Sequence, residues 1–141
     1  MLGLLLPWLG RAEGEGTPYL VGFAQDDLSN DWRAAQVRAL EQAFRDDPDI
    51  RFVYTDARGS TARQIQDIEQ LAARGLDVLI TSPRDTRAMT PVIREVHRNG
   101  TPVVLLTRRI TTGDFTVFIH PDDCGIGRRA ARLLARHLDG R

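Results

Sequence analysis

The segment Gln25–Arg33 concentrates side chains that could hold a small polar molecule. It contains the amide groups of Gln25 and Asn30, the guanidinium of Arg33 and, just before it, the indole of Trp32. An indole can lie against the apolar C–H face of a sugar ring while polar neighbours bond the ring hydroxyls. The spacing is equally compatible with Trp32 beginning a helix face that packs on the rest of the fold.

Asp85 and Arg108 add a carboxylate and a second guanidinium from later in the chain. Arg108 presents a planar fork of donors that suits a pair of sugar hydroxyls or a carboxylate. With Arg109 beside it, Arg108 could equally be a solvated loop arginine. The candidate ligand-binding residues are therefore Gln25, Asn30, Trp32, Arg33, Asp85 and Arg108.

Signatures of catalysis and of cofactor binding are weak or absent. Asp56, Asp85 and Asp122 could form a carboxylate cluster for magnesium, but carboxylates after strands are also routine helix caps. The sequence has no GxGxxG after its first strand, no GxxxxGK[ST] and no GxSxG, so it lacks the usual phosphate cradles and the nucleophile elbow. Cys124 lies near His120, yet a buried structural cysteine is the commoner role. We expect a binding protein with no catalytic residue, metal or cofactor.

The charge balance argues against nucleic acid as a partner. Lys plus Arg and Asp plus Glu number 19 each, so the formal net charge is zero. A non-specific nucleic-acid binder normally shows a basic excess or a basic stripe. The single cysteine excludes an internal disulfide and a cysteine-rich zinc site.

Strand-like and helix-like segments alternate from Tyr19 onward, and these elements would position the candidate residues. The β-rich runs are mostly continuous apolar stretches, which is typical of strands covered on both faces. They are Tyr19–Ala24, Ile50–Thr55, Val78–Thr81, Val103–Thr107 and Thr116–Ile119. Amphipathic helical stretches surround Val37–Phe44, Ile65–Ala72, Val92–Val96 and Ile126–Leu134. This alternation predicts an α/β fold, a doubly wound, mostly parallel five-stranded sheet in the order 2-1-3-4-5 with helices on both faces.

Three helix starts carry local signals. Thr61 with Gln64 has the spacing of a capping box at the start of the second helix. Thr90 followed by Pro91 has the pattern of an N-cap with proline at the first helical position. Either Asp122 or Asp123 can cap the last helix.

The predicted sheet brings the candidate residues together. In open α/β sheets, ligands bind outside the carboxyl ends of the strands, near the switch in strand order. The segments that follow the five predicted strands carry an aromatic ring, carboxylates, amides and arginines, and all six candidate residues lie at or after these strand ends. We therefore expect a hydrogen-bonding pocket at this edge of the sheet.

The N-terminal residues differ from the rest of the chain. Leu2–Leu9 is an apolar run that is far too short to span a bilayer as a helix. With the small residues Gly10 and Ala12 after it, the run resembles the core of a secretory signal peptide, although a basic segment before it is missing. We expect residues 1–16 to be a partial signal peptide and leader, with export to the periplasm. The alternative is a disordered apolar tail.

Several linked motifs resemble the ribose-binding-type, or type I, family of periplasmic sugar-binding proteins. The resemblance covers residues 19–141 and rests on the motifs in their order along the chain. They are VGFAQDDLSNDWR (21–33), QIQDIEQL (64–71), GLDVLITSP (75–83), GTPVVLLTR (100–108) and IHPDDCGIGR (119–128).

The resemblance implies a two-lobed receptor that closes on a sugar as the solute-binding part of an ABC importer. It implies ligand contacts from Asn30, Trp32 and Arg108, whereas Thr107 stands where the family commonly has an aspartate. Residues 17–141 would be the N-terminal lobe, with no counterpart of the second lobe in this sequence. A lone lobe exposes surface that its partner lobe would cover, which predicts self-association.

Two other roles use the same predicted fold. One is the extracytoplasmic ligand-sensing domain of a signalling protein such as a hybrid histidine kinase, which a downstream transmembrane helix and kinase region would identify. The other is the effector core of a LacI-type repressor, which needs a helix-turn-helix, and residues 1–18 are too short and too apolar to form one. The leading expectation is solute binding for an ABC-type importer, with its membrane subunits as partners.

Overall fold

Five parallel strands form one sheet in the order β2-β1-β3-β4-β5, as the sequence predicts. The structure is a computed structural model that describes residues 16–138, so residues 1–15, most of the predicted leader, lie outside the described residues. The strands are β1 (Tyr19–Gln25), β2 (Ile50–Asp56), β3 (Val78–Thr81), β4 (Val103–Leu106) and β5 (Val117–Ile119). The helices are α1 (Asp31–Phe44), α2 (Thr61–Ala73), α3 (Thr86–Arg98) and α4 (Asp123–His137).

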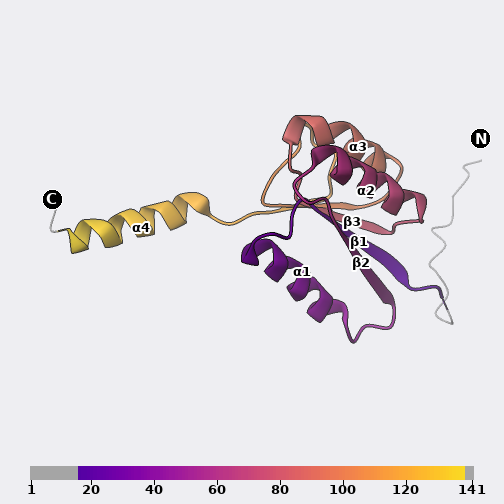
Figure 1. The fold of residues 1–141 in the computed structure, drawn as a ribbon, viewed down its shortest axis with the longest axis horizontal. Helices are drawn as coiled ribbons and strands as arrows, with labels where there is room; N and C mark the ends of the chain where they lie inside the picture. Colours follow the sequence, from indigo (N-terminus) through magenta and orange to yellow (C-terminus); the bar gives the residue numbers. More distant parts are fainter. Residues whose placement is uncertain (1–15, 139–141) are drawn as a thin grey trace, which may run out of the picture.

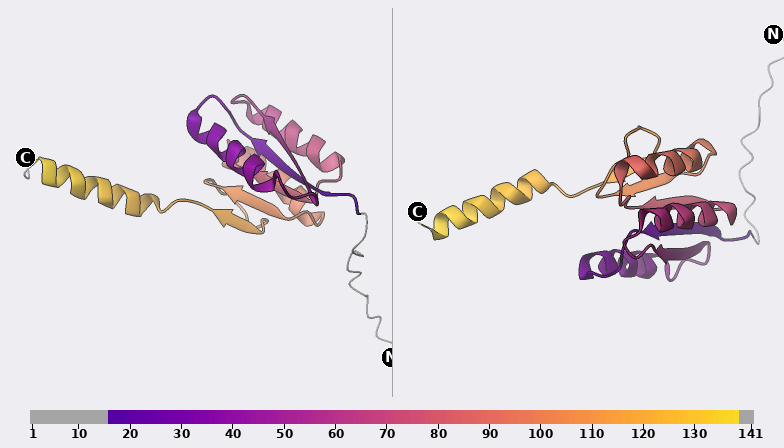
Figure 2. Two further views of the ribbon diagram at one scale, coloured as in Figure 1. Left: turned by 90° about the horizontal axis from the view of Figure 1, so that it is seen from below. Right: turned by 45° about the horizontal axis from the view of Figure 1, so that its top comes forward.

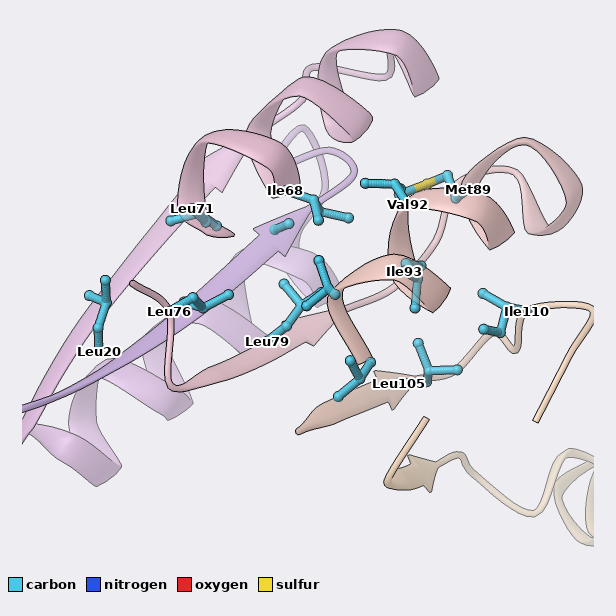
Figure 3. Packing of buried hydrophobic residues seen from close by; sticks show 13 residues of the cluster. Leu20, Ile68, Leu71, Leu76, Leu79, Met89, Val92, Ile93, Leu105 and Ile110 are labelled. Carbon is cyan, nitrogen blue, oxygen red and sulfur yellow. The ribbon is translucent and has the colours of Figure 1, made fainter. Parts of the chain in front are cut away.

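Helices α2 and α3 cover one face of the sheet (Figure 1). Their apolar side chains pack on alternate residues of the central strands, because successive side chains of a strand point to opposite faces. Figure 3 shows this core, in which Ile68 and Leu71 of α2 and Ile93 of α3 face Leu79 and Leu105. All five side chains are at most 1% exposed. This face is the better filled of the two.

Helix α1 covers the opposite face only in part. Val37 packs with Phe23 and Ile80 in a second, smaller core on this face. The helix contacts β2, so the part of this face over β4 and β5 has no such cover. There, the side chains of β4 are half-buried and those of β5 are 44% and 55% exposed. The residues of this open sheet face are Val104, Leu106, Val117 and Ile119.

Helix α4 projects away from the sheet. All three views place it beyond the end of β5, with no other element beside it (Figures 1 and 2). The helix forms where periodicity predicts it, and Asp122 caps it by accepting a hydrogen bond from the Gly125 N–H at 2.9 Å. Every side chain from Ile126 to Leu138 is exposed. Its apolar stripe therefore has no partner within the described residues.

The second helix begins differently from the capping box that the sequence predicts. Ser60 is the N-cap, and its hydroxyl accepts a hydrogen bond from the Arg63 N–H at 3.3 Å. Thr61 is already helical. Gln64 does not reach back to the cap, because its amide is buried under the sheet edge and bonds other partners there. The prediction of a Thr61–Gln64 capping box is wrong.

The third helix begins five residues before the predicted position. Asp85 is the N-cap, and its carboxylate accepts hydrogen bonds from the N–H groups of Arg87 and Ala88 at 2.9 and 2.8 Å. Pro91 lies inside the helix, and the Thr90 hydroxyl bonds the Thr86 carbonyl oxygen. The predicted N-cap at Thr90 is therefore wrong, since Asp85 satisfies two N–H groups that Thr90 could not reach.

No helix among residues 16–138 has the length and apolar composition needed to cross a membrane.

Candidate ligand-binding site

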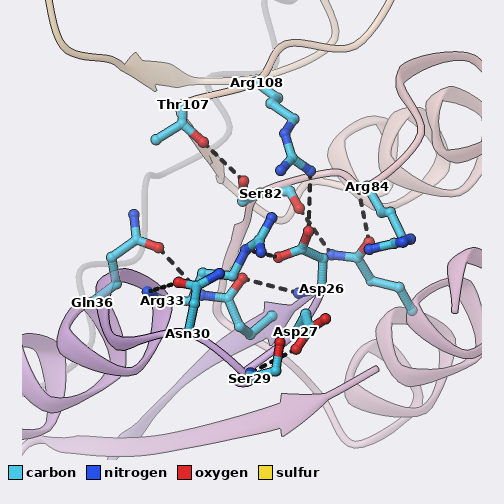
Figure 4. Close-up of polar contacts among 12 residues, drawn as sticks. Asp26, Asp27, Ser29, Asn30, Arg33, Gln36, Ser82, Arg84, Thr107 and Arg108 are labelled. Atoms are coloured by element: carbon cyan, nitrogen blue, oxygen red, sulfur yellow. Dashed lines mark hydrogen bonds and ion pairs between the residues drawn. The ribbon is translucent and has the colours of Figure 1, made fainter. Parts of the chain in front are cut away.

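A buried carboxylate shared by two arginines lies at the carboxyl end of β1. Asp26 follows β1 directly, and its side chain is fully buried. Nε of Arg33 lies 2.8 Å from its Oδ1, and Nη1 of Arg108 lies 3.1 Å from its Oδ2. Figure 4 shows the two guanidiniums reaching the carboxylate from different elements, α1 and the segment after β4. A carboxylate out of water is stable only with such partners, so this ion pair fixes both arginines.

Two amides beside this ion pair are oriented by their hydrogen bonds. Oε1 of Gln25 accepts from the Asp26 N–H at 2.9 Å, so its Nε2 is the group that donates to Oε1 of Gln36 at 3.3 Å. Oδ1 of Asn30 caps α1 by accepting from the Arg33 N–H at 3.0 Å. The NH2 groups of Gln36 and Asn30 consequently remain free to donate to a ligand.

The strand ends of β3 and β4 meet through a pair of hydroxyls. Oγ of Ser82 lies 3.0 Å from Oγ1 of Thr107. Thr107 adopts a φ of +60°, which a β-branched residue rarely does. The chain turns sharply here, since the Arg108 N–H bonds the carbonyl oxygen of Leu106. Strained backbone is common at functional sites, and here the turn sets the direction of the next side chain, Arg108.

Gln64 connects the carboxyl ends of β1 and β3 through hydrogen bonds of its buried side chain. The side chain comes from α2 and is fully buried. Its Nε2 donates to the carbonyl oxygens of Ala24 and Ser82, each at 3.1 Å, and its Oε1 accepts from the Arg84 N–H at 3.0 Å. The amide thus ties the end of β1 to the segment after β3, which are the elements that carry Asp26 and Ser82.

Above the buried side chains of Asp26 and Gln64, other side chains line an open pocket of about 450 Å³. Trp32 stands at its rim with 66% of its surface exposed. The lining therefore combines an aromatic face, two guanidiniums, two amides and two hydroxyls. The lining residues are Asn30, Trp32, Arg33, Gln36, Ser82, Thr107 and Arg108.

Four of the six predicted ligand-binding residues meet in this pocket, and two do not line it. Asn30, Trp32, Arg33 and Arg108 are part of the lining. Gln25 is fully buried and supports Gln36 from behind. Asp85 is exposed, and its carboxylate is occupied as the N-cap of α3.

Sequence reasoning missed the residue on which the arrangement depends. Asp26 stands among the polar residues after β1, but nothing in the local pattern distinguishes it from Asp27. One signal was available: Asp26 directly follows six consecutive buried residues, Leu20–Gln25, and this position marks it as inward-facing. Gln36 could have been found from Arg33, because residues three apart share a helix face.

Asp27 lies outside the pocket and has its own partners. The Ser29 hydroxyl and the Ser29 N–H, the latter 2.6 Å from Oδ1, hold the pKa of Asp27 below its usual value, and the guanidiniums of Arg33 and Arg84 add to this effect. Its carboxylate is thus ionised and engaged at neutral pH. Among residues 16–138, no three His, Cys, Asp or Glu side chains cluster as metal ligands would.

Comparison with known proteins places this chain in a family. The chain is 23% identical over 125 residues to the ribose import binding protein of Bacillus subtilis, an alignment that covers 89% of this chain and 41% of the relative. The fructose binding periplasmic domain of a hybrid two component system superposes with a TM-score of 0.79 at 26% identity, covering 87% of this chain and 41% of that one. The periplasmic binding protein component of the arabinose ABC transporter from Shewanella sp. ANA-3 superposes with a TM-score of 0.78 at 26% identity, covering 86% and 41%.

The chain thus spans 41% of the length of these relatives and corresponds to their N-terminal part. The observed sheet order is that of the type I fold of these neighbours. The family model of the periplasmic binding protein domain matches residues 21–141. The chain belongs to the periplasmic binding protein domain family.

Proposed function

We propose that this chain binds a sugar as the solute-binding component of an ABC-type importer. The observation that carries the proposal is the convergence of Trp32, Arg33 and Arg108 on one pocket at the carboxyl edge of the sheet. Relatives in the same family are named as import binding proteins for ribose or as part of an arabinose ABC transporter. The proposal involves no catalytic step.

The pocket has the parts that sugar recognition requires. Trp32 offers an exposed ring on which the apolar face of a sugar can stack. Arg33 and Arg108 are held in place by Asp26 before a ligand arrives, so few rotamers are lost on binding. The volume of about 450 Å³ lies within the range of small-molecule sites. Because the pocket is open on one side, a second surface would be needed to bury the ligand fully.

Thermal unfolding in the presence of sugars tests the proposal. A ligand that binds only the native state stabilises it by about 2.7 kcal/mol at a hundred times its Kd. We expect one sugar of a panel of pentoses, hexoses and polyols to raise the Tm, and Trp32→Ala and Arg108→Ala to abolish the shift. Tyr54→Ala is the matched control, because Tyr54 lies on the outer strand β2, is 44% exposed and does not line this pocket. A shift that survives both pocket substitutions would contradict this site.

A sensory role is the second candidate. It is favoured by the similarity to the fructose binding domain of a hybrid two component system. In that case the same pocket would report on an external sugar instead of delivering it to a transporter. Sequencing the intact gene discriminates the two roles, since a transmembrane helix followed by a kinase region would support sensing.

The proposed function also includes export of the chain. Residues 1–16 would direct the chain to the periplasm, where a solute-binding component meets its ligand and the membrane subunits of the importer. A fusion of these residues to alkaline phosphatase, an enzyme active only after export, measures this directly. An inactive fusion made in normal amounts would contradict an export signal in residues 1–16.

Self-association is expected of the chain on its own. In the open sheet face (Val104, Leu106, Val117 and Ile119), Val117 and Ile119 are exposed and the other two are half-buried, and the apolar stripe of α4 is exposed. Burying one leucine or isoleucine side chain contributes about 1.5–3 kcal/mol. We propose that α4 of a second copy packs on the open sheet face, because helices cover both faces of a doubly wound sheet and α1 leaves Val117 and Ile119 exposed. The stripe consists of Ile126, Leu133, Leu134 and Leu138.

A further inference from the structure

The pocket lining presents many hydrogen-bond donors. Within residues 16–138, Nη1 and Nη2 of Arg33 and Nε and Nη2 of Arg108 make no hydrogen bond. The NH2 groups of Gln36 and Asn30 are also free, because the oxygens of both amides are already used. The indole N–H of Trp32 adds another donor at the rim. All of these residues line the same pocket, and Figure 4 shows how Asn30, Arg33, Gln36 and Arg108 lie around Asp26.

Acceptors are scarce in the same lining. None of the described residues that line the pocket carries a carboxylate, and the hydroxyls of Ser82 and Thr107 are bonded to each other. Asp26 is buried beneath the lining with an arginine on each carboxylate oxygen. The neighbouring carboxylates Asp27 and Asp85 are engaged by Ser29 and by the first turn of α3, respectively.

The net charge of the arginines and aspartates at the pocket is positive. The guanidiniums of Arg33, Arg84 and Arg108 surround the carboxylates of Asp26 and Asp27, so one positive charge is in excess among these five side chains. Arg33 and Arg108 are only 20% and 37% exposed, so water and salt screen that charge less than they would on an open surface. The first turn of α1 lies beside the pocket, and the positive end of its dipole acts in the same direction.

We propose that the pocket selects a sugar that carries a carboxylate, such as a uronic or aldonic acid, over the matching neutral sugar. This inference rests on the proposed sugar-binding function and specifies its ligand class. A carboxylate has acceptor capacity without any proton to place, and its two oxygens can accept from two free N–H groups of one guanidinium at once. The hydroxymethyl group of the matching neutral sugar brings a proton and no charge, and the acceptors among the described lining side chains are neutral hydroxyl and amide oxygens that already take part in hydrogen bonds.

Matched pairs of ligands test the inference on the 141-residue chain. D-galacturonate with D-galactose, and D-glucuronate with D-glucose, differ only in a carboxylate for a hydroxymethyl group. Titrations of the 15N-labelled chain at neutral pH, followed through the indole N–H signal of Trp32 and the Nε–H signals of Arg33 and Arg108, give the Kd even when binding is weak. We expect the acid of at least one pair to bind about tenfold or more tightly than its neutral partner, a difference of about 1.4 kcal/mol.

Variants connect that preference to the proposed residues. Arg108→Gln should remove most of the preference for the acid while the chain remains folded. Arg87→Gln removes an exposed arginine of α3 outside the pocket, so it should leave both affinities unchanged. Sodium acetate at the same concentration supplies a carboxylate without a sugar, and it should bind more weakly than the sugar acid.

The outcomes separate this inference from the proposed function. A neutral sugar that binds as tightly as its acid would overturn the ligand class and leave sugar binding intact. Acetate that binds as tightly as the sugar acid would overturn both sugar selection and the inference. If no member of the panel binds the folded chain, both proposals fail for this pocket.

Discussion

Replacing Gln64 with methionine should destabilise the fold, although the two side chains have similar lengths and similar helix propensities. Gln64 is fully buried, and its amide serves the end of β1 and the segment after β3. The thioether of methionine can donate no hydrogen bond and accepts only weakly. The consequence therefore depends on which backbone groups lose their partner.

Two backbone groups are left unpaired by this substitution. The Ala24 carbonyl oxygen still accepts from the Thr81 hydroxyl at 2.9 Å. The Ser82 carbonyl oxygen and the Arg84 N–H lose the amide as a partner. A buried polar group without a partner costs about 1–3 kcal/mol, and the surroundings of Arg84 are only partly buried, so we expect a total of about 2–4 kcal/mol.

Urea denaturation measures this loss. At an m-value of about 1–3 kcal/mol/M, the expected loss moves the midpoint by about 1 M or more to lower urea. Gln70→Met is the matched control, since Gln70 is exposed on the same helix and should change the midpoint little. If Gln64→Met shifts the midpoint no more than Gln70→Met does, the buried amide does not hold the sheet edge together.

Three further predictions concern packing, ionisation and association. Gly22→Ala should lower the free energy of unfolding by about 1–3 kcal/mol in thermal melts, because a Cβ there would lie 2.6 Å from Cδ1 of Leu76. The pKa of Asp114 should lie below its usual value, because Thr112 and the Arg98 guanidinium, whose Nε lies 3.0 Å from Oδ1 of Asp114, favour its ionised form, and Arg98→Met should raise it in an NMR titration. Since the native pKa is below the unfolded one, this carboxylate stabilises the fold above the unfolded pKa, and the contribution is lost as pH falls through the native pKa. Leu133→Gln should weaken self-association by about tenfold or more in sedimentation equilibrium.

Matched variants show what would contradict these three predictions. Gly113→Ala places a Cβ with no atom within 4 Å, so an equal loss of stability would contradict the packing argument for Gly22. Arg94→Met should raise the pKa of Asp114 less than Arg98→Met does, since only Arg98 also bonds the carboxylate, and an equal effect would contradict the role of that bond. Arg132→Gln changes the polar side of α4, and an equal effect on association would contradict a role for the apolar stripe.

The sheet could be predicted from the sequence because burial on both faces leaves continuous apolar runs. Val78–Thr81 forms β3 with the predicted bounds, and the other four strands differ from the prediction by one residue at one end. The carboxyl edge followed from the sheet alone, which explains why Asn30, Trp32, Arg33 and Arg108 meet there. Periodicity and strand order were therefore enough to predict where the candidate site lies.

Local patterns failed where residues distant in sequence compete for the same polar group. Gln64 fits a capping box, yet the Ser82 carbonyl oxygen and the Arg84 N–H draw its amide inward. Asp85 could have faced a ligand, but the first turn of α3 has N–H groups that it can satisfy. Asp26 became recognisable only once β4 had brought Arg108 beside it, 82 residues away in the chain. Such choices are decided by tertiary contacts, which no window of sequence contains.

The open sheet face and the pocket are linked through β4. Leu106 ends β4 on the face that α1 leaves uncovered, and Thr107 and Arg108 follow it directly at the pocket. A partner that packs on Leu106 would restrain the turn that aims Arg108, and would lower the ordering cost of binding a ligand there. Because coupling between two binding equilibria is reciprocal, the ligand must then strengthen the association of the partner by the factor by which the partner strengthens ligand binding.

This coupling can be measured without knowing the partner in the cell, because a second copy of the chain serves as one. Sedimentation equilibrium with and without a saturating amount of the sugar or sugar acid that binds best should show a tighter dimer in the presence of the ligand. Arg108→Gln should remove that increase and leave the association of the ligand-free chain unchanged, because Arg108 lies outside the open sheet face. If the dimer constant does not respond to the ligand, the pocket and the open sheet face are independent, and β4 is a strand that happens to border both.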